Sequence, residues 1–200
     1  MEIFQALLTA WPTAMPELSP RRPDSNIAAL VIAAEQKLDP TFAQATAEKK
    51  AALRAGLWLL ADDLGRAHQI CQNIPTPHGS AWHAIMHRRE GDFSNSLYWF
   101  GKARDVRWAL SGQPAEPGPE PTLATAVRHA LLQTPAIAAR PEAAQWANEL
   151  AAQPYDPARL VEFAEAAARD SQSSDWQNAL LTIQRIEWLG LFTECLRSTR

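Results

Sequence analysis

The stretch that decides the fold runs from Ser80 to Ala103 and reads SAWHAIMHRREGDFSNSLYWFGKA. We expect Ser80 to open a helix that continues to Glu90. Gly91 then suits the residue after a helix end, where left-handed backbone geometry is common. Asp92 is placed to cap a second helix over residues 93–103, because its carboxylate can accept hydrogen bonds from unpaired amides of the first turn. The stretch therefore predicts two helices joined by a tight acidic turn.

An upstream segment has the same organisation. Residues 55–67 (AGLWLLADDLGRA) align without gaps with residues 84–96 (AIMHRREGDFSNS), at an offset of 29. Asp63 falls on Asp92, and small residues occupy both ends of each segment. We therefore expect two helical hairpins, with Ala84 and Ser96 lining the inner seam of the second.

The second hairpin resembles a known repeat. The segment EGDFSNSLYWFGKA (residues 90–103) is similar to tetratricopeptide and Sel1-like repeats, and the resemblance extends over about residues 51–104. The spacing is shorter than the usual repeat length of roughly 34 residues. The family implies a helical scaffold that binds partners through a groove, without catalysis. The residues 82–90 and 98–100 also resemble an uncharacterised microbial family, which implies no activity.

The remaining chain also favours helices. Alanine and leucine are abundant, only 8 residues are glycine, and the 15 prolines lie between apolar blocks. No window shows the period-2 alternation of β-branched and aromatic residues that indicates strands. We predict one all-α domain over residues 1–200, built from antiparallel hairpins as a partial solenoid or an irregular bundle. Residues 12–24 are expected to form a proline-rich arm, and residues 111–121 a linker.

Charge and composition exclude several function classes. The net charge of −3 provides no basic surface for nucleic acid. No stretch approaches the roughly 18 apolar residues of a membrane span. Two cysteines are too few for a secreted disulfide framework. We expect a cytoplasmic monomer or homodimer that binds a protein or peptide, with no nucleic acid and no membrane.

One cluster contains residue types that bind metals or transfer protons. His83 and His87 are four residues apart and Glu90 is seven from His83, so a helix places all three on one face. Two imidazoles and a carboxylate can share a divalent metal such as zinc. His68 lies on the preceding predicted helix and joins this candidate metal set. A fourth ligand is expected from one of three side chains: His68, Asp92 or Glu187.

Two alternatives to a metal remain open for the same cluster. His87 aligns with Trp58, an inward position, so a buried neutral His87 bonded to Glu90 or to a carbonyl is a structural interpretation. In an acid–base interpretation, His83 or His87 carries the proton, oriented by Glu90 or Glu187. The pattern excludes metalloproteases with Glu directly after the first histidine, because Ala84 stands there.

Cys71 is three residues after His68, which allows a thiolate–imidazole pair, although a small packed core residue is the simpler interpretation. We expect the partner groove to involve four side chains: Arg88, Tyr98, Trp99 and Glu187. The sequence thus favours a non-enzymatic helical scaffold that needs no cofactor. The alternative is a small metal-binding protein or hydrolase centred on His83, His87 and Glu90.

Overall fold

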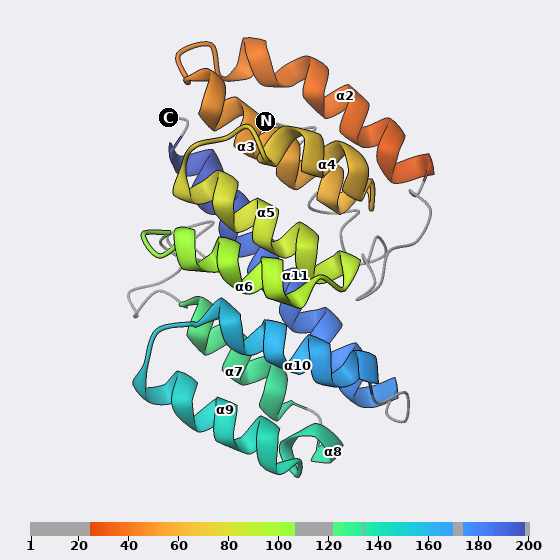
Figure 1. The fold of residues 1–200 in the computed structure, drawn as a ribbon, viewed down its shortest axis with the longest axis vertical. Coiled ribbons are helices and arrows are strands. Elements are labelled where there is room, and N and C mark those ends of the chain that lie inside the picture. The colour runs from red at the N-terminus through yellow and green to blue at the C-terminus, as the bar shows by residue number, and fades with distance from the viewer. Residues whose placement is uncertain (1–24, 107–121, 134, 170–173, 199–200) are drawn as a thin grey trace. The chain divides into compact units, whose positions relative to one another are not determined.

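The computed structural model describes residues 25–106, 122–133, 135–169 and 174–198. Throughout these ranges the chain forms α-helices and no β-strand, which confirms the predicted all-α class (Figure 1). Contacts between Cα atoms divide the chain into two compact units, one of residues 1–106 with 195–200 and the other of residues 107–194. The expected arm at 12–24 and the expected linker at 111–121 lie outside the described residues.

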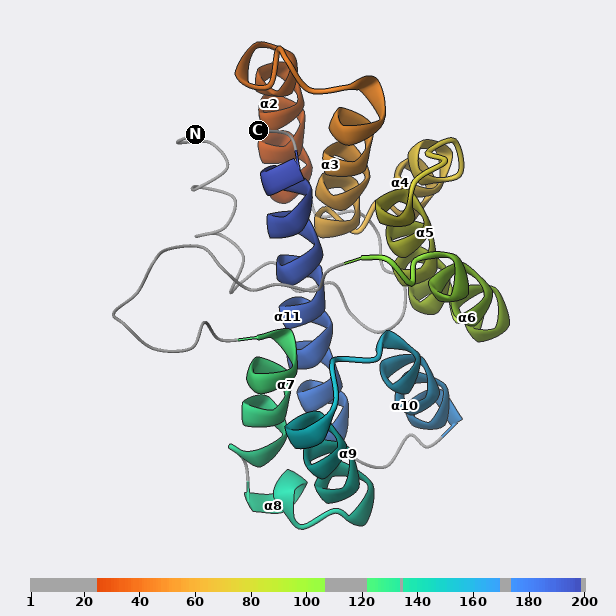
Figure 2. The ribbon, with the colours of Figure 1, turned by 90° about the vertical axis from the view of Figure 1, so that its left-hand side faces the viewer.

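The first unit contains the helices that carry the candidate site. They are α2 (Ser25–Thr41), α3 (Ala47–Leu60), α4 (Leu64–Cys71), α5 (Pro77–Glu90) and α6 (Phe93–Lys102). Each helix packs against the next one in the chain, so the five lie side by side in sequence order (Figures 1 and 2). Trp58 Nε1 donates a hydrogen bond to Glu35 Oε1 at 2.8 Å and ties α3 to α2.

Side-chain caps set where these helices begin. Thr46, Asp63, Thr76 and Asp92 precede α3, α4, α5 and α6, and each accepts a backbone amide of the first turn. The predicted start of α5 at Ser80 is therefore wrong. Thr76 Oγ1 accepts the Gly79 amide and Pro77 occupies the first turn, where its missing N–H costs nothing, so the helix begins three residues earlier.

The turns after α3 and α5 have the same backbone conformation, 29 residues apart. Asp62 has φ 62° and Gly91 has φ 81°, both left-handed. The residues that follow, Asp63 and Asp92, have φ/ψ of −87°/77° and −89°/73°. Each also donates its amide to the carbonyl five residues earlier, at 3.0 and 2.9 Å. The aligned acidic turns are thus structurally equivalent, while the tetratricopeptide or Sel1-like relationship stays a prediction.

Ala84 and Ser96 line the inner seam of the second hairpin, as predicted from the sequence. Ala84 and Ser96 are both 0% exposed. The Ser96 hydroxyl donates to the Ala84 carbonyl at 2.8 Å, so the polar side chain is satisfied where α6 crosses α5. Small side chains at this contact let the two backbones approach closely. The contact between Ala84 and Ser96 determines which face of α5 packs against α6, and therefore which face is left for its other neighbours.

A buried arginine joins the two hairpins. Arg89 on α5 is 1% exposed, and its Nη1 donates to the Leu59 carbonyl at 2.7 Å. Its Nη2 pairs with the Asp62 carboxylate in the turn between α3 and α4. Burial lowers the pKa of Arg89 to about 10, and Asp62 opposes that shift. The guanidinium is therefore held charged inside the unit and fixes the position of α5 against the first hairpin.

The second unit contains α7 (Leu123–Leu132), α8 (Pro135–Ala138), α9 (Pro141–Ala152), α10 (Pro157–Arg169) and α11 (Ser174–Ser198) as far as Glu194. Arg159 bonds both carboxylate oxygens of Glu149 at 2.8 and 3.0 Å and links α10 to α9. The Phe163 ring lies between Trp146 and Trp176, with centroids 4.9 and 5.4 Å away. None of the described helices combines the length and the apolar character that crossing a bilayer requires.

Candidate metal centre

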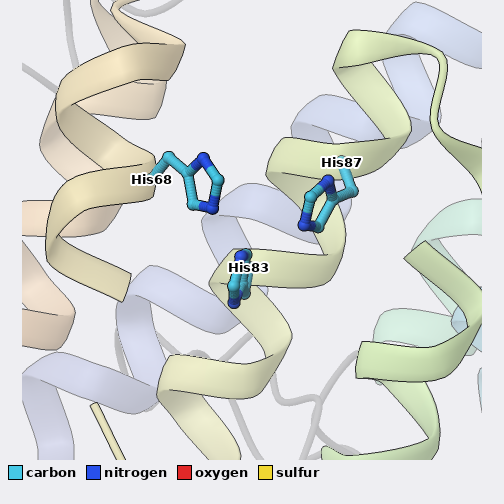
Figure 3. Close-up of side chains that lie close together, drawn as sticks. All are labelled: His68, His83 and His87. Carbon is cyan, nitrogen blue, oxygen red and sulfur yellow. The ribbon is translucent and has the colours of Figure 1, made fainter. Parts of the chain in front are cut away.

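Three histidines converge between α4 and α5. His68, His83 and His87 each offer a ring nitrogen, and the three nitrogens lie within 4.8 Å of one another. The ring centroids are 4.7 Å apart for His83 and His87, 4.8 Å for His68 and His83, and 5.3 Å for His68 and His87. Figure 3 shows the rings projecting into one space from two helices. The predicted grouping of these histidines is what the structure displays.

Local sequence explains this convergence. His83 and His87 are one helical turn apart on α5, so their rings lie one above the other, with planes only 20° apart. His68 is on α4, which packs directly against α5. The Asp63 cap fixes the first residue of α4 and hence which face carries His68. The Asp63 cap of α4, the Thr76 cap of α5 and the packing of these two helices therefore position the three histidines.

His83 is the most unusual member of the cluster. It is 3% exposed, and neither Nδ1 nor Nε2 has a hydrogen-bond partner. Burial lowers the pKa of His83 to about 4, and the positive charge that His87, His68 and Lys102 can carry adds to this effect. The ring is therefore neutral at pH 7, with a free lone pair. The hydrogen-bonded structural interpretation does not describe this residue.

His87 has carboxylates on one side of its ring. Its Nδ1 lies 3.4 Å from Glu90 Oε2 and 3.8 Å from Asp92 Oδ2. Burial lowers the pKa of His87, and the two carboxylates oppose that shift. Metal-bound histidines usually direct their other ring nitrogen to a carboxylate, which fixes the tautomer. With a proton on Nδ1, Nε2 of His87 is the nitrogen left for a metal.

The structure thus separates Glu90 from the three donors. The four ligands expected from the sequence, His83, His87, Glu90 and His68, divide into three imidazoles and one carboxylate that flanks His87. Glu90 is exposed, with 37% of its side chain accessible. It lies beside His87 Nδ1, as Asp92 does, but neither carboxylate makes a hydrogen bond to that nitrogen.

Trp99 and Lys102 on α6 complete the surroundings. The Trp99 indole stacks on His83 with centroids 4.2 Å apart and planes 29° apart. Lys102 Nζ lies 4.5 Å from the centroids of both the Trp99 and Tyr98 rings. The sequence placed Trp99 in the predicted partner groove, and Lys102 was not among the predicted site residues. Only the packing of α6 on α5 brings them to the histidines.

The other predicted groove residues have different environments. Arg88 and Glu187 are 1% and 0% exposed, and Tyr155 donates to Glu187 Oε1 at 2.8 Å. Tyr98 is 56% exposed and Trp99 is partly buried. Arg88 and Glu187 are therefore core residues, whereas Tyr98 and Trp99 reach the surface of the first unit.

Cys71 is unsuited to thiolate chemistry. Its Sγ donates to the His68 carbonyl at 3.6 Å, and the side chain is 2% exposed. Burial raises the pKa of the Cys71 thiol to about 12. At neutral pH the group is a protonated core residue, in agreement with the simpler sequence interpretation.

The distances between the three ring nitrogens can be compared with the distances that a bound zinc ion requires. Tetrahedral zinc with Zn–N bonds of about 2.0–2.1 Å needs nitrogens about 3.3–3.4 Å apart. The widest pair in the structure therefore has to approach by at most roughly 1.5 Å. His68 is the partly exposed member of the group, so we expect its side chain to make this movement. The arrangement can hold one divalent ion with three nitrogens.

Comparisons with known proteins add no relative: no family model, no curated protein and no solved structure matches the chain.

Proposed function

We propose that this protein binds a divalent transition-metal ion, with zinc the best match, through His68, His83 and His87. One observation carries the proposal. His83 is buried with both ring nitrogens unpaired, and it faces two further imidazoles. An unsatisfied buried polar group costs about 1–3 kcal/mol, so a folded protein retains one only where something offsets that cost. A shared metal ion would take the lone pair of one His83 ring nitrogen and so offset part of that cost.

The donor set supports zinc in particular. Imidazole nitrogen suits zinc, copper, iron and nickel, whereas magnesium and calcium prefer oxygen. Zinc accepts tetrahedral geometry without a cost from its d electrons. In the part of the chain that the structure describes, no fourth His, Cys, Asp or Glu joins the group. The site then resembles an open zinc site, in which water or a ligand takes the fourth position.

The test is metal binding by the full chain after chelation. We expect one Co²⁺ per chain, with the visible bands of tetrahedral cobalt, and competition by Zn²⁺ in calorimetry. The variant His68→Gln removes one donor at a partly exposed position, so folding is expected to survive. It should weaken Zn²⁺ binding by at least about 100-fold, more than the roughly 10–100-fold loss typical of a partner that only orients a ligand.

His129→Gln is the matched control, because His129 is an exposed histidine on α7 whose recorded side-chain bond is to Gln133. It should leave Zn²⁺ affinity unchanged. Circular dichroism of each variant confirms the helical content. A wild-type chain without stoichiometric Co²⁺ or Zn²⁺ binding overturns the proposal. An equal loss of affinity in His129→Gln and His68→Gln does the same.

Two functions expected from the sequence stay predictions. A helical scaffold for a protein or peptide partner is compatible with the hairpin architecture, and fold alone is a weak warrant for it. Hydrolysis at the metal requires water at the open fourth position, which three-histidine zinc sites provide. The metal proposal stands independently of both.

A further inference from the structure

A second feature lies beside the histidines in the first unit. A cavity of about 490 Å³ opens between the segment that precedes α5 and the end of α6. Its walls include Gln72 and Thr76, Ser80 on α5, and Trp99 and Lys102 on α6. This volume falls within the roughly 300–1,000 Å³ typical of small-molecule sites. It is too large for an inorganic ion alone.

Among the described residues that line the cavity, Lys102 is the charged one and none is a carboxylate. The cavity also contains the start of α5, whose first turn has no acidic residue and whose aligned peptide dipoles favour a negative group. A helix start and an exposed lysine do not define a ligand, so a further observation is needed.

That observation is the buried polar wall. Ser80 is 8% exposed and lines the cavity, and its hydroxyl makes no hydrogen bond within the described part of the chain. Trp99 lines the same cavity, and its ring also contacts His83 and Lys102. The cavity therefore combines an unused hydroxyl, an aromatic wall and a cation. Gln72, Asn73 and Thr76 add further polar groups to the wall. Polar groups that converge beside an aromatic surface are a feature of ligand sites.

We propose that this cavity binds a small organic anion, with a phosphate monoester or carboxylate group at Lys102 and Ser80 and an apolar part against Trp99. The negative group gains a charge-assisted hydrogen bond from the ammonium, which is stronger than a neutral one. The cavity has room for the organic part. The inference does not depend on the metal, since none of the three histidines lines the cavity.

The probe is phenyl phosphate, titrated into the metal-free full chain, with benzoate, inorganic phosphate and benzyl alcohol as comparisons. The readout is calorimetry together with the indole N–H resonance of Trp99, assigned by loss of that peak in Trp99→Phe. We expect phenyl phosphate or benzoate to saturate and to shift that resonance. Inorganic phosphate should bind at least tenfold more weakly, and benzyl alcohol should not saturate.

Three lysine variants locate the anionic group. Lys102→Met keeps most of the apolar stem and should weaken binding of the phenyl phosphate at least tenfold. Lys102→Arg keeps the charge and should stay within about threefold of the wild type. Lys37→Met removes an exposed lysine of α2 and should change nothing.

Three results overturn the inference. They are the absence of saturable binding by both organic anions, equal binding of benzyl alcohol, and unchanged affinity in Lys102→Met. Because zinc is absent throughout, these results leave the metal proposal unaffected. Loss of Zn²⁺ binding in the earlier experiment likewise leaves the anion titration intact.

Discussion

The indole of Trp99 stacks on the imidazole of His83, with ring centroids 4.2 Å apart. This contact joins α6 to the histidine cluster and covers the most buried donor of the three. His83 is therefore well packed, but its ring nitrogens have no hydrogen-bond partner. We expect these nitrogens to lower the stability of the metal-free protein and to favour metal binding, so the two effects can be measured separately.

Replacement of His83 by leucine should therefore stabilise the metal-free protein or leave it unchanged. Leucine fills a similar volume with an apolar side chain and removes the two buried unpaired nitrogens of His83. Relief of that penalty is worth about 1 kcal/mol in the free energy of unfolding after the lost contact with Trp99 is subtracted. Urea denaturation in the presence of a chelator measures the change. A loss of more than 2 kcal/mol would show that His83 is structural.

Glu90→Gln tests the carboxylate beside His87. The amide keeps the shape but loses the charge that lies 3.4 Å from Nδ1. We expect Zn²⁺ affinity to fall by about 10-fold, within the range for a partner that orients a metal-bound histidine. Competition with a chromophoric chelator provides the measurement. Abolished binding would instead make Glu90 a direct ligand, as the sequence pattern suggested.

Cys71 should resist thiol reagents in the folded protein. With the pKa of its thiol raised from 9.0 to about 12, the thiolate is scarce at pH 8. A raised folded-state pKa means that the unfolded chain loses this proton first. The contribution of Cys71 to stability is therefore complete below pH 9 and declines between pH 9 and about 12. Labelling of a Cys195→Ala variant with a disulfide reagent should proceed only on unfolding, and rapid labelling at pH 8 would disprove burial of Cys71.

Two glycines should respond in opposite directions to alanine. A Cβ at Gly79 would lie 2.4 Å from Ile74 Cβ and 2.5 Å from the Ile74 carbonyl oxygen, so backbone has to move. Gly79→Ala should cost about 1–3 kcal/mol in the free energy of unfolding. At Gly101, on α6, a Cβ would have no neighbour within 4 Å. Gly101→Ala should add up to about 1 kcal/mol from helix propensity. Thermal unfolding of both variants provides the comparison.

Local signals in the sequence determined most of the first unit. Asp63, Gly91 and Asp92 act through the backbone of their own turns, so their effect can be read from neighbours in the chain. The same holds for the shared face of His83 and His87, because helical spacing alone puts them together. The predicted start of α5 was wrong because prolines between apolar blocks were interpreted as helix ends, whereas Pro77 lies in the first turn of α5 after the Thr76 cap. This capping signal is equally local.

From the residues alone it follows that the chain is helical, where its acidic turns fall, and that His83 and His87 share one side of a helix. The packing of the helices established that the predicted His68 reaches this group, that Glu90 flanks His87 instead of joining the donors, and that Trp99 and Lys102 adjoin them. The difference arises from the distance along the chain over which each interaction acts. Caps and helical periodicity act over a few residues, whereas these neighbours depend on the angle and depth at which α4, α5 and α6 pack, which the small seam residues and the buried Arg89 set together.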